Sequence, residues 1–307
     1  MKITLPLFDT QNQCKPIKQK NIGFNDVLLN KKDIISFTNQ ASFLKTARRA
    51  KEAGAEIMLL SKKGEDSIES IENVCKKYIP ILEVDYIENI PKRLLSEKLN
   101  YNAYTLPHYN EDCALEKITM YIPSSKLTKE VTSSIVHELV HCEQAINNNN
   151  YMGLIDITNG NMKQARVLNA MSNAIFNDMQ AYKTKSLFLS AYIRLLKCKD
   201  EEVAMSAALG CKTDEDLKYF FADKAEKTVD STIYSVLKEQ DVDSFLPLAR
   251  NPKKLKEVIM SQCKLKALQE QEAYSAQKEF LQDIGSSLTV EQKMNPVFYR
   301  VLAKALS

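Results

Sequence analysis

Two histidines four residues apart carry the strongest chemical signal in this sequence. The stretch His137-Glu138-Leu139-Val140-His141 contains them. On a helix, positions i and i+4 share one face about 5–6 Å apart, so both imidazoles can reach one Zn²⁺ at about 2.0–2.1 Å. Glu138 can then take a proton from a zinc-activated water. The chain has 3 histidines in all, and two of them in this spacing favour a metal site over a chance arrangement.

The residues around the motif predict the elements that position it. Residues 127–147 carry apolar side chains at helical spacing, among them Val131, Ile135 and Leu139, and therefore predict an amphipathic helix. The alternating segment 118–122 predicts a strand just before this helix. In peptidases with this motif, a strand edge beside the helix binds extended substrate by main-chain pairing, and we expect the same use here.

The helix resembles the active-site helix of the zincin metallopeptidases, in a gluzincin-like form. It is more narrowly similar to uncharacterised bacterial metallopeptidase domains with the pattern H-E-L-x-H-x-x-Q. The residues that carry this resemblance are His137-Glu138-Leu139-Val140-His141 with Gln144, the upstream Ala103-Tyr104, Pro107 and 118–122, and the downstream Asp178-Met179-Gln180-Ala181. The resemblance covers about residues 100–190. It implies a zincin-like fold and zinc-dependent peptide hydrolysis, without indicating a target.

A catalytic zinc usually has three protein ligands and one open position. No histidine follows His141, so a carboxylate on a later helix is expected as the third ligand. Asp178 is the first choice, since the small Ala181 at i+3 would let its helix approach closely. Glu270 and Glu272 are the alternates, because they are the more usual acid type. His108 is a further candidate ligand.

Two polar residues could assist the metal. Tyr182, one turn after Asp178, could donate a hydrogen bond to an oxyanion at the metal, although a tyrosine at the core edge is the plainer interpretation. Gln144, three residues after His141, could orient a ligand.

Composition excludes several other classes of protein. The chain has 42 basic and 39 acidic residues, a net charge of +3, and only 7 glycines in 307 residues. We therefore expect no nucleic-acid partner and no nucleotide-binding loop, because these need a basic face or a glycine-rich turn. The 7 cysteines are spread singly, which favours reduced thiols. No secretory signal or membrane-spanning run is visible, so we expect a cytoplasmic protein without membrane contact, with export by a signal-less route left open.

The expected fold is α+β and predominantly helical. We expect a small mixed N-terminal region (1–95), a zincin-like core (96–198) and a helical C-terminal region (199–307). The pattern predicts a helix over 41–53 ended by Gly54, a strand over 55–60, and one long helix over 162–198. It also predicts strands at 81–86 and 100–106, and helices at 66–78, 201–209, 214–239, 252–282 and 288–305.

The function predicted from these residues is that of a zinc peptidase acting on proteins or peptides, with Glu138 as the general base. One alternative is a non-catalytic helical interaction protein that keeps a structural or vestigial metal site. Another is a secreted protease toxin or effector. Four protein ligands around the metal, or no metal at all, would favour the non-catalytic alternative over the peptidase.

Overall fold

The computed structural model describes residues 40–90, 103–110, 114–124, 126–147, 154–155, 157–158, 160–223 and 252–307. The helices are α2 (Gln40–Lys63), α3 (Ile68–Tyr78), α4 (Lys129–Asn147), α6 (Met162–Gln180), α7 (Lys185–Cys198), α8 (Glu201–Ala208), α11 (Pro252–Asp283) and α12 (Val290–Ala305). The strands are β1 (Leu82–Tyr86), β2 (Tyr104–Tyr109) and β3 (Leu115–Ile122). The fold class is therefore confirmed as α+β and mainly helical. Much of the helix expected over 214–239 lies outside the described residues.

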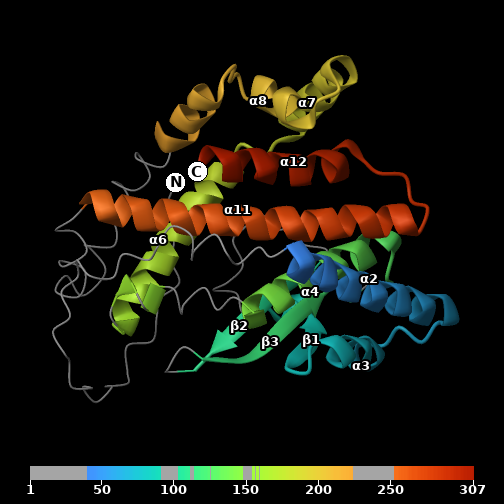
Figure 1. Cartoon of the computed structure of the whole chain (residues 1–307). Helices are drawn as coiled ribbons and strands as arrows, with labels where there is room; N and C mark the ends of the chain where they lie inside the picture. The colour runs from blue at the N-terminus through green and yellow to red at the C-terminus, as the bar shows by residue number, and fades with distance from the viewer. Residues whose placement is uncertain are drawn as a thin grey trace.

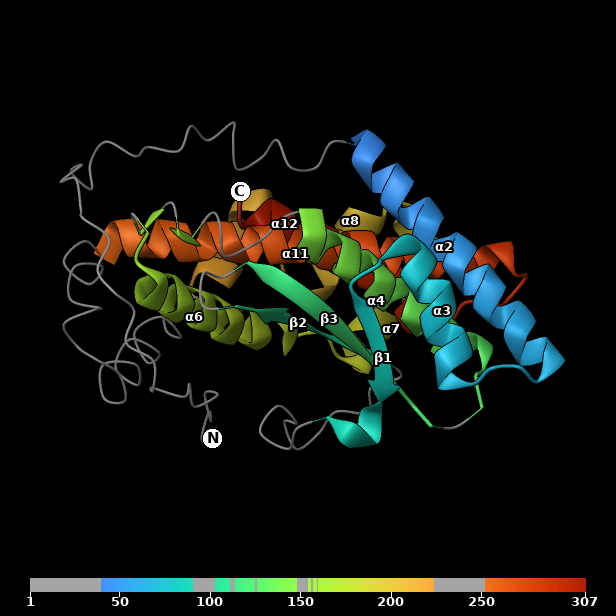
Figure 2. The ribbon, with the colours of Figure 1, turned by 90° about the horizontal axis from the view of Figure 1, so that it is seen from below.

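The described strands form one small mixed sheet in the order β1-β3-β2. Strand β1 runs parallel to β3, and β2 runs antiparallel to it (Figure 2). The segment 118–122 therefore belongs to the central strand, and the expectation that it offers a free edge is wrong. Beside α4 the edge strand is β2. Its Pro107 fits that place, because proline has no N–H for a ladder and is confined to edge strands, strand starts and bulges.

Helix α2 runs without interruption through the position where an end was expected. Gly54 does not end the helix as its residue type predicts, because α2 continues to Lys63, and residues 55–60 are helical rather than a strand. A Cβ on Gly54 would lie 2.4 Å from Cγ2 of Val136 and 3.0 Å from the Phe280 ring. This glycine is therefore a contact point that lets α2 pack closely on α4 and α11.

Two hydrophobic cores organise the molecule. The first, here called the sheet-side core, contains buried residues of α2, α3, β1, β3 and α4. The second, the helical core, contains buried residues of α6, α7, α8 and α12. Helix α11 serves both: Leu255, Ile259 and Cys263 pack into the helical core, whereas Ala276 and Phe280 pack into the sheet-side core. Figure 1 shows α11 running the length of the molecule between them.

The segment expected as one helix over 162–198 is two helices, α6 and α7. A turn over residues 181–184 separates them. The hydroxyl of Thr184 accepts a hydrogen bond from the N–H of Leu187 and caps α7. The turn points Lys183 toward α11 and α12, where its Nζ atom meets tyrosines of both helices.

The sheet-side core draws residues from all three regions expected from the sequence, 1–95, 96–198 and 199–307.

Within the described part of the chain, no helix combines the length and the apolarity that crossing a membrane requires.

Candidate metal centre

One face of α4 packs antiparallel on α11 through a row of polar side chains. The row begins at Ser133, whose hydroxyl accepts a hydrogen bond from Gln277 of α11 at 3.1 Å. It continues through the two histidines and ends at Gln144, whose Nε2 donates to the backbone carbonyl of Gln269 at 3.1 Å. These α4 positions lie three or four residues apart and so share one face of the helix. The small buried residue Ala273 lets the two helices approach closely along this row.

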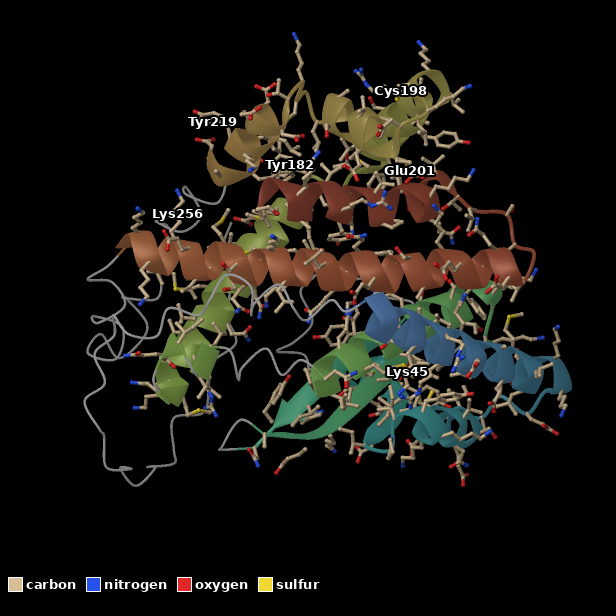
Figure 3. The ribbon with its side chains drawn as sticks, viewed as in Figure 1. Lys45, Tyr182, Cys198, Glu201, Tyr219 and Lys256 are labelled. Carbon is tan, nitrogen blue, oxygen red and sulfur yellow. The ribbon has the colours of Figure 1, made fainter. Side chains whose placement is uncertain are left out.

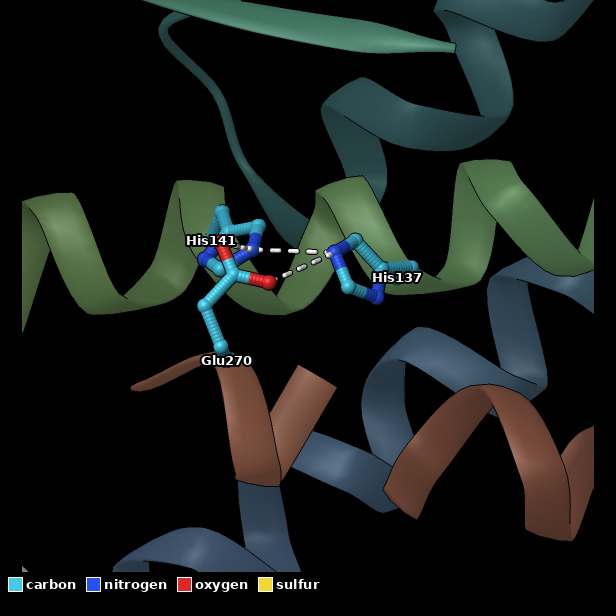
Figure 4. Close-up of side chains that lie close together, drawn as sticks. All are labelled: His137, His141 and Glu270. Carbon is cyan, nitrogen blue, oxygen red and sulfur yellow. Dashed lines mark hydrogen bonds and ion pairs between the residues drawn. The ribbon is translucent and has the colours of Figure 1, made fainter. Parts of the chain in front are cut away.

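The carboxylate of Glu270 meets both histidines in the middle of this row. The Nε2 atoms of His137 and His141 lie 3.0 Å apart. Oε2 of Glu270 lies 3.7 Å from Nε2 of His137, and Oε1 lies 3.6 Å from Nε2 of His141. Ligand atoms at 2.0–2.2 Å from one tetrahedral zinc would lie roughly 3.3–3.6 Å from each other. The two distances to Glu270 lie at or just above this range, whereas the two Nε2 atoms are closer than it and would have to move slightly apart to bind one ion. The three side chains (Figure 4) form a group that could hold a divalent ion, with two nitrogens and one carboxylate.

Gln144 fixes the orientation of His141. Nδ1 of His141 lies 2.8 Å from Oε1 of Gln144. An amide oxygen only accepts, so Nδ1 carries the proton and Nε2 keeps its lone pair for a metal. Nε2 of the same amide donates to Oε2 of Glu272 at 3.0 Å. Glu272 thus supports the centre through Gln144, whereas Glu270 faces the histidines directly.

His137 lies deeper than His141, with 8% of its surface exposed. Its pKa is well below the ordinary value, first because burial disfavours the charged ring and then because His141 and Lys183 add positive charge. A neutral imidazole is the form that binds metal. Nδ1 of His137 finds no hydrogen-bond partner among the described residues. The ring is held instead by Tyr274, which packs edge-on with ring centroids 4.3 Å apart.

Glu138 points away from α11 toward the edge strand β2. Its carboxylate accepts a hydrogen bond from the Thr105 hydroxyl at 2.6 Å. Burial raises the pKa of Glu138 to about 7, helped by the charge of Glu270, against the lowering effects of His141 and Thr105. A carboxyl group with a pKa near neutrality can both take up and release a proton at neutral pH.

A lysine and two tyrosines form a second layer behind His137. The Tyr274 ring stacks on Tyr299 of α12, with centroids 5.4 Å apart and an interplanar angle of 13°. Nζ of Lys183 donates to the hydroxyl of Tyr274 at 3.2 Å and to that of Tyr299 at 2.8 Å. The Tyr299 hydroxyl in turn donates to Oε1 of Gln180 at 3.0 Å.

The remaining candidates from the sequence lie elsewhere. Asp178 is an exposed residue of α6 and does not belong to the group of ligand atoms around His137 and His141. Tyr182, labelled in Figure 3, packs edge-on against Phe220 with ring centroids 5.0 Å apart, which places it at the edge of the helical core. Nε2 of His108 lies 2.8 Å from the hydroxyl of Thr119, on the sheet.

Sequence reasoning missed four residues that contact the centre or its second layer: Thr105, Lys183, Tyr274 and Tyr299. Tyr274 had a usable signal, because it stands four residues after Glu270 and must share its helix face. The other three reach the site through tertiary packing, and no local pattern marks them.

Comparisons with protein families, with curated proteins and with solved structures returned no match for this chain. The chemistry of the site therefore has to be argued from the residues themselves.

Proposed function

We propose that this chain is a zinc-dependent peptidase with a zincin-like core. In this proposal, His137, His141 and Glu270 hold the zinc, and Glu138 is the general base. Glu270 takes the place given first to Asp178 on sequence grounds.

The observation that carries the proposal is the position of Glu270. This residue comes from a different helix, 129 positions after His141, yet its two oxygens lie 3.6–3.7 Å from the two Nε2 atoms. These distances exceed the 2.7–3.2 Å of a direct hydrogen bond and suit ligands of a shared ion. Two histidines and one glutamate are also a known donor set of catalytic zinc sites.

The chain's own residues supply the remaining chemistry. Zinc, when bound, lowers the pKa of water to about 7 and polarises a carbonyl. Glu138 takes the proton of the attacking water and later delivers it to the nitrogen of the leaving amine. Thr105 holds the Glu138 carboxylate in place through the hydrogen bond from its hydroxyl. The edge strand β2, which carries Thr105, offers backbone groups beside which an extended peptide can lie.

The number of ligands supports a peptidase over a structural metal site. The group found among the described residues has three members, whereas a structural zinc is usually closed by four protein ligands. Three ligands leave the open position that a reacting water requires.

The test pairs the Glu138→Gln variant with a matched Glu130→Gln control, which changes an exposed glutamate on the first turn of the same helix. The wild type should hold about one zinc per chain and cleave members of a library of short unstructured peptides. Glu138→Gln should keep the zinc and lose activity by about 10²–10⁴-fold, the usual contribution of a general base. Glu130→Gln should match the wild type.

Full activity in Glu138→Gln would exclude this mechanism. A wild type that binds no zinc even after metal is supplied, or holds zinc and cleaves no peptide in the library, would favour the non-catalytic interaction protein.

A further inference from the structure

Lys183 is a half-buried cation beside the candidate metal centre, without a carboxylate in contact among the described residues. Its hydrogen-bond partners are the hydroxyls of Tyr274 and Tyr299, and its Nζ also lies 5.0 Å from the centroid of each ring. No described carboxylate comes within ion-pair distance of it, although the charges of Glu270 and Glu291 act on it from farther away. Burial lowers the pKa of Lys183, which shows that its surroundings disfavour the charge.

Such an arrangement calls for a partner. A charge that is even partly withdrawn from water is stabilised by pairing, because the hydration it loses has to be replaced. An ammonium group has three protons to donate. Two of them reach the tyrosine hydroxyls, and the third has no acceptor among the described residues. The two tyrosine hydroxyls hold Nζ in place before any ligand arrives.

The position of Lys183 relates this cation to the metal centre. Tyr274 separates the two: its ring contacts His137 on one side, and its hydroxyl accepts from Lys183 on the other. An extended peptide rises about 3.3–3.6 Å per residue. The Tyr274 centroid lies 4.3 Å from that of His137 and 5.0 Å from Nζ of Lys183. A group held at Nζ would therefore lie within about three residues of a peptide bond placed at the histidines.

We propose that Lys183 binds a carboxylate of the peptide substrate. This inference rests on the proposed peptidase function, because it assigns the anion to a substrate lying across the metal centre. The carboxylate comes either from the C-terminus of the peptide or from an aspartate or glutamate side chain. In the first case, the enzyme releases one to three residues from the C-terminal end.

Binding to the metal-free protein tests the proposal without any hydrolysis and without a metal that could capture the carboxylate. Three N-acetylated hexapeptides of otherwise neutral sequence are compared by calorimetry: one with a free C-terminal acid, one with a C-terminal amide, and one amide with a single glutamate. We expect the wild type to bind the free acid or the glutamate peptide at least tenfold more tightly than the neutral amide. The tighter of the two identifies the source of the carboxylate.

Two variants assign this preference to Lys183. Lys183→Met keeps the apolar stem and should abolish the preference, whereas Lys183→Arg keeps the charge and should retain part of it. Lys293→Met is the matched control, since Nζ of Lys293 lies 3.4 Å from the Tyr192 hydroxyl and 4.9 Å from that ring's centroid, facing α7 instead. It should bind like the wild type.

Equal binding of all three peptides by the wild type, binding of none, or a preference that survives in Lys183→Met would overturn the inference. These outcomes are separate from the fate of the proposed function. A protein that cleaves peptides but shows no carboxylate preference remains a peptidase, and one that shows the preference without cleaving retains a carboxylate site that belongs to another activity.

Discussion

The two cores of this molecule differ in what they contribute to the candidate metal centre. The sheet-side core positions α4, and with it both histidines and Glu138. The helical core contributes to the second layer, through Tyr299 of α12 and the α6–α7 turn that carries Lys183. Glu270 stands on α11 between the residues that enter one core and those that enter the other.

This division shows that the centre lies where the cores meet and belongs to neither alone. In the proposed site, the local motif provides two nitrogens and a base. The proposed third ligand, Glu270, meets them because α11 packs on α4 in the observed antiparallel arrangement. Changes at the contact between the cores should therefore weaken the metal site more than changes inside either core.

The largest effect is expected from Glu270→Gln, which removes the ligand charge from the contact between the cores. Zinc affinity should fall by more than about 100-fold. This exceeds the 10–100-fold loss that follows when a residue that only hydrogen-bonds to a metal ligand is removed. A competition titration with a chromophoric chelator measures this. Asp178→Asn is the control and should bind zinc like the wild type. If Asp178→Asn loses zinc while Glu270→Gln keeps it, the third ligand is Asp178 and the contact has no role.

The sequence predicted the part of this site that is local. Helix α4 and the shared face of His137 and His141 follow from the spacing of residues along one helix. The pairing of α4 with α11 could not be found this way, since it depends on helices far apart in the chain. Asp178 and Glu270 both stand on helices, and each is followed three residues later by an alanine. Only the packing of the helices shows which of the two carboxylates meets the histidines.

The errors in the predicted elements have the same origin. Gly54 has the residue type of a helix terminator, but its lack of a side chain serves the contact with Val136 and Phe280. The break between α6 and α7 carries no glycine or proline. It is accompanied by the Thr184 cap and by the hydrogen bonds of Lys183 to Tyr274 and Tyr299, and these long-range bonds cannot be predicted without the partner helices.

A smaller loss of zinc affinity is expected from Gln144→Leu. This change removes the acceptor for Nδ1 of His141 and the bridge to Glu272. Zinc affinity should fall by about 10–100-fold while the ligands themselves remain. Gln277→Leu is the matched control, because it removes another hydrogen bond between α11 and α4 without touching a histidine. Equal losses in both variants would show that the amide acts by joining the helices rather than by orienting His141.

The smallest effect on zinc affinity is expected from Gly54→Ala, which should instead lower the stability of the fold. In an exposed helix this change would stabilise by up to about 1 kcal/mol. Here the added methyl would overlap Val136, so the free energy of unfolding should fall by about 1–3 kcal/mol, measured by urea denaturation. The double variant with Val136→Ala should lose less than the sum of the two single changes. A gain in stability in Gly54→Ala would show that Val136 and Phe280 can move aside for the added methyl group at little cost.

The separation of Glu270 from the histidines also has a consequence in time. A ribosome adds about 5–20 residues per second, and α11 follows α4 by more than a hundred residues. The histidines therefore leave the ribosome several seconds before the carboxylate that completes their group. During this interval the nascent chain carries the motif but not the assembled centre, so the hydrolytic activity proposed for this site cannot arise before α11 has been made.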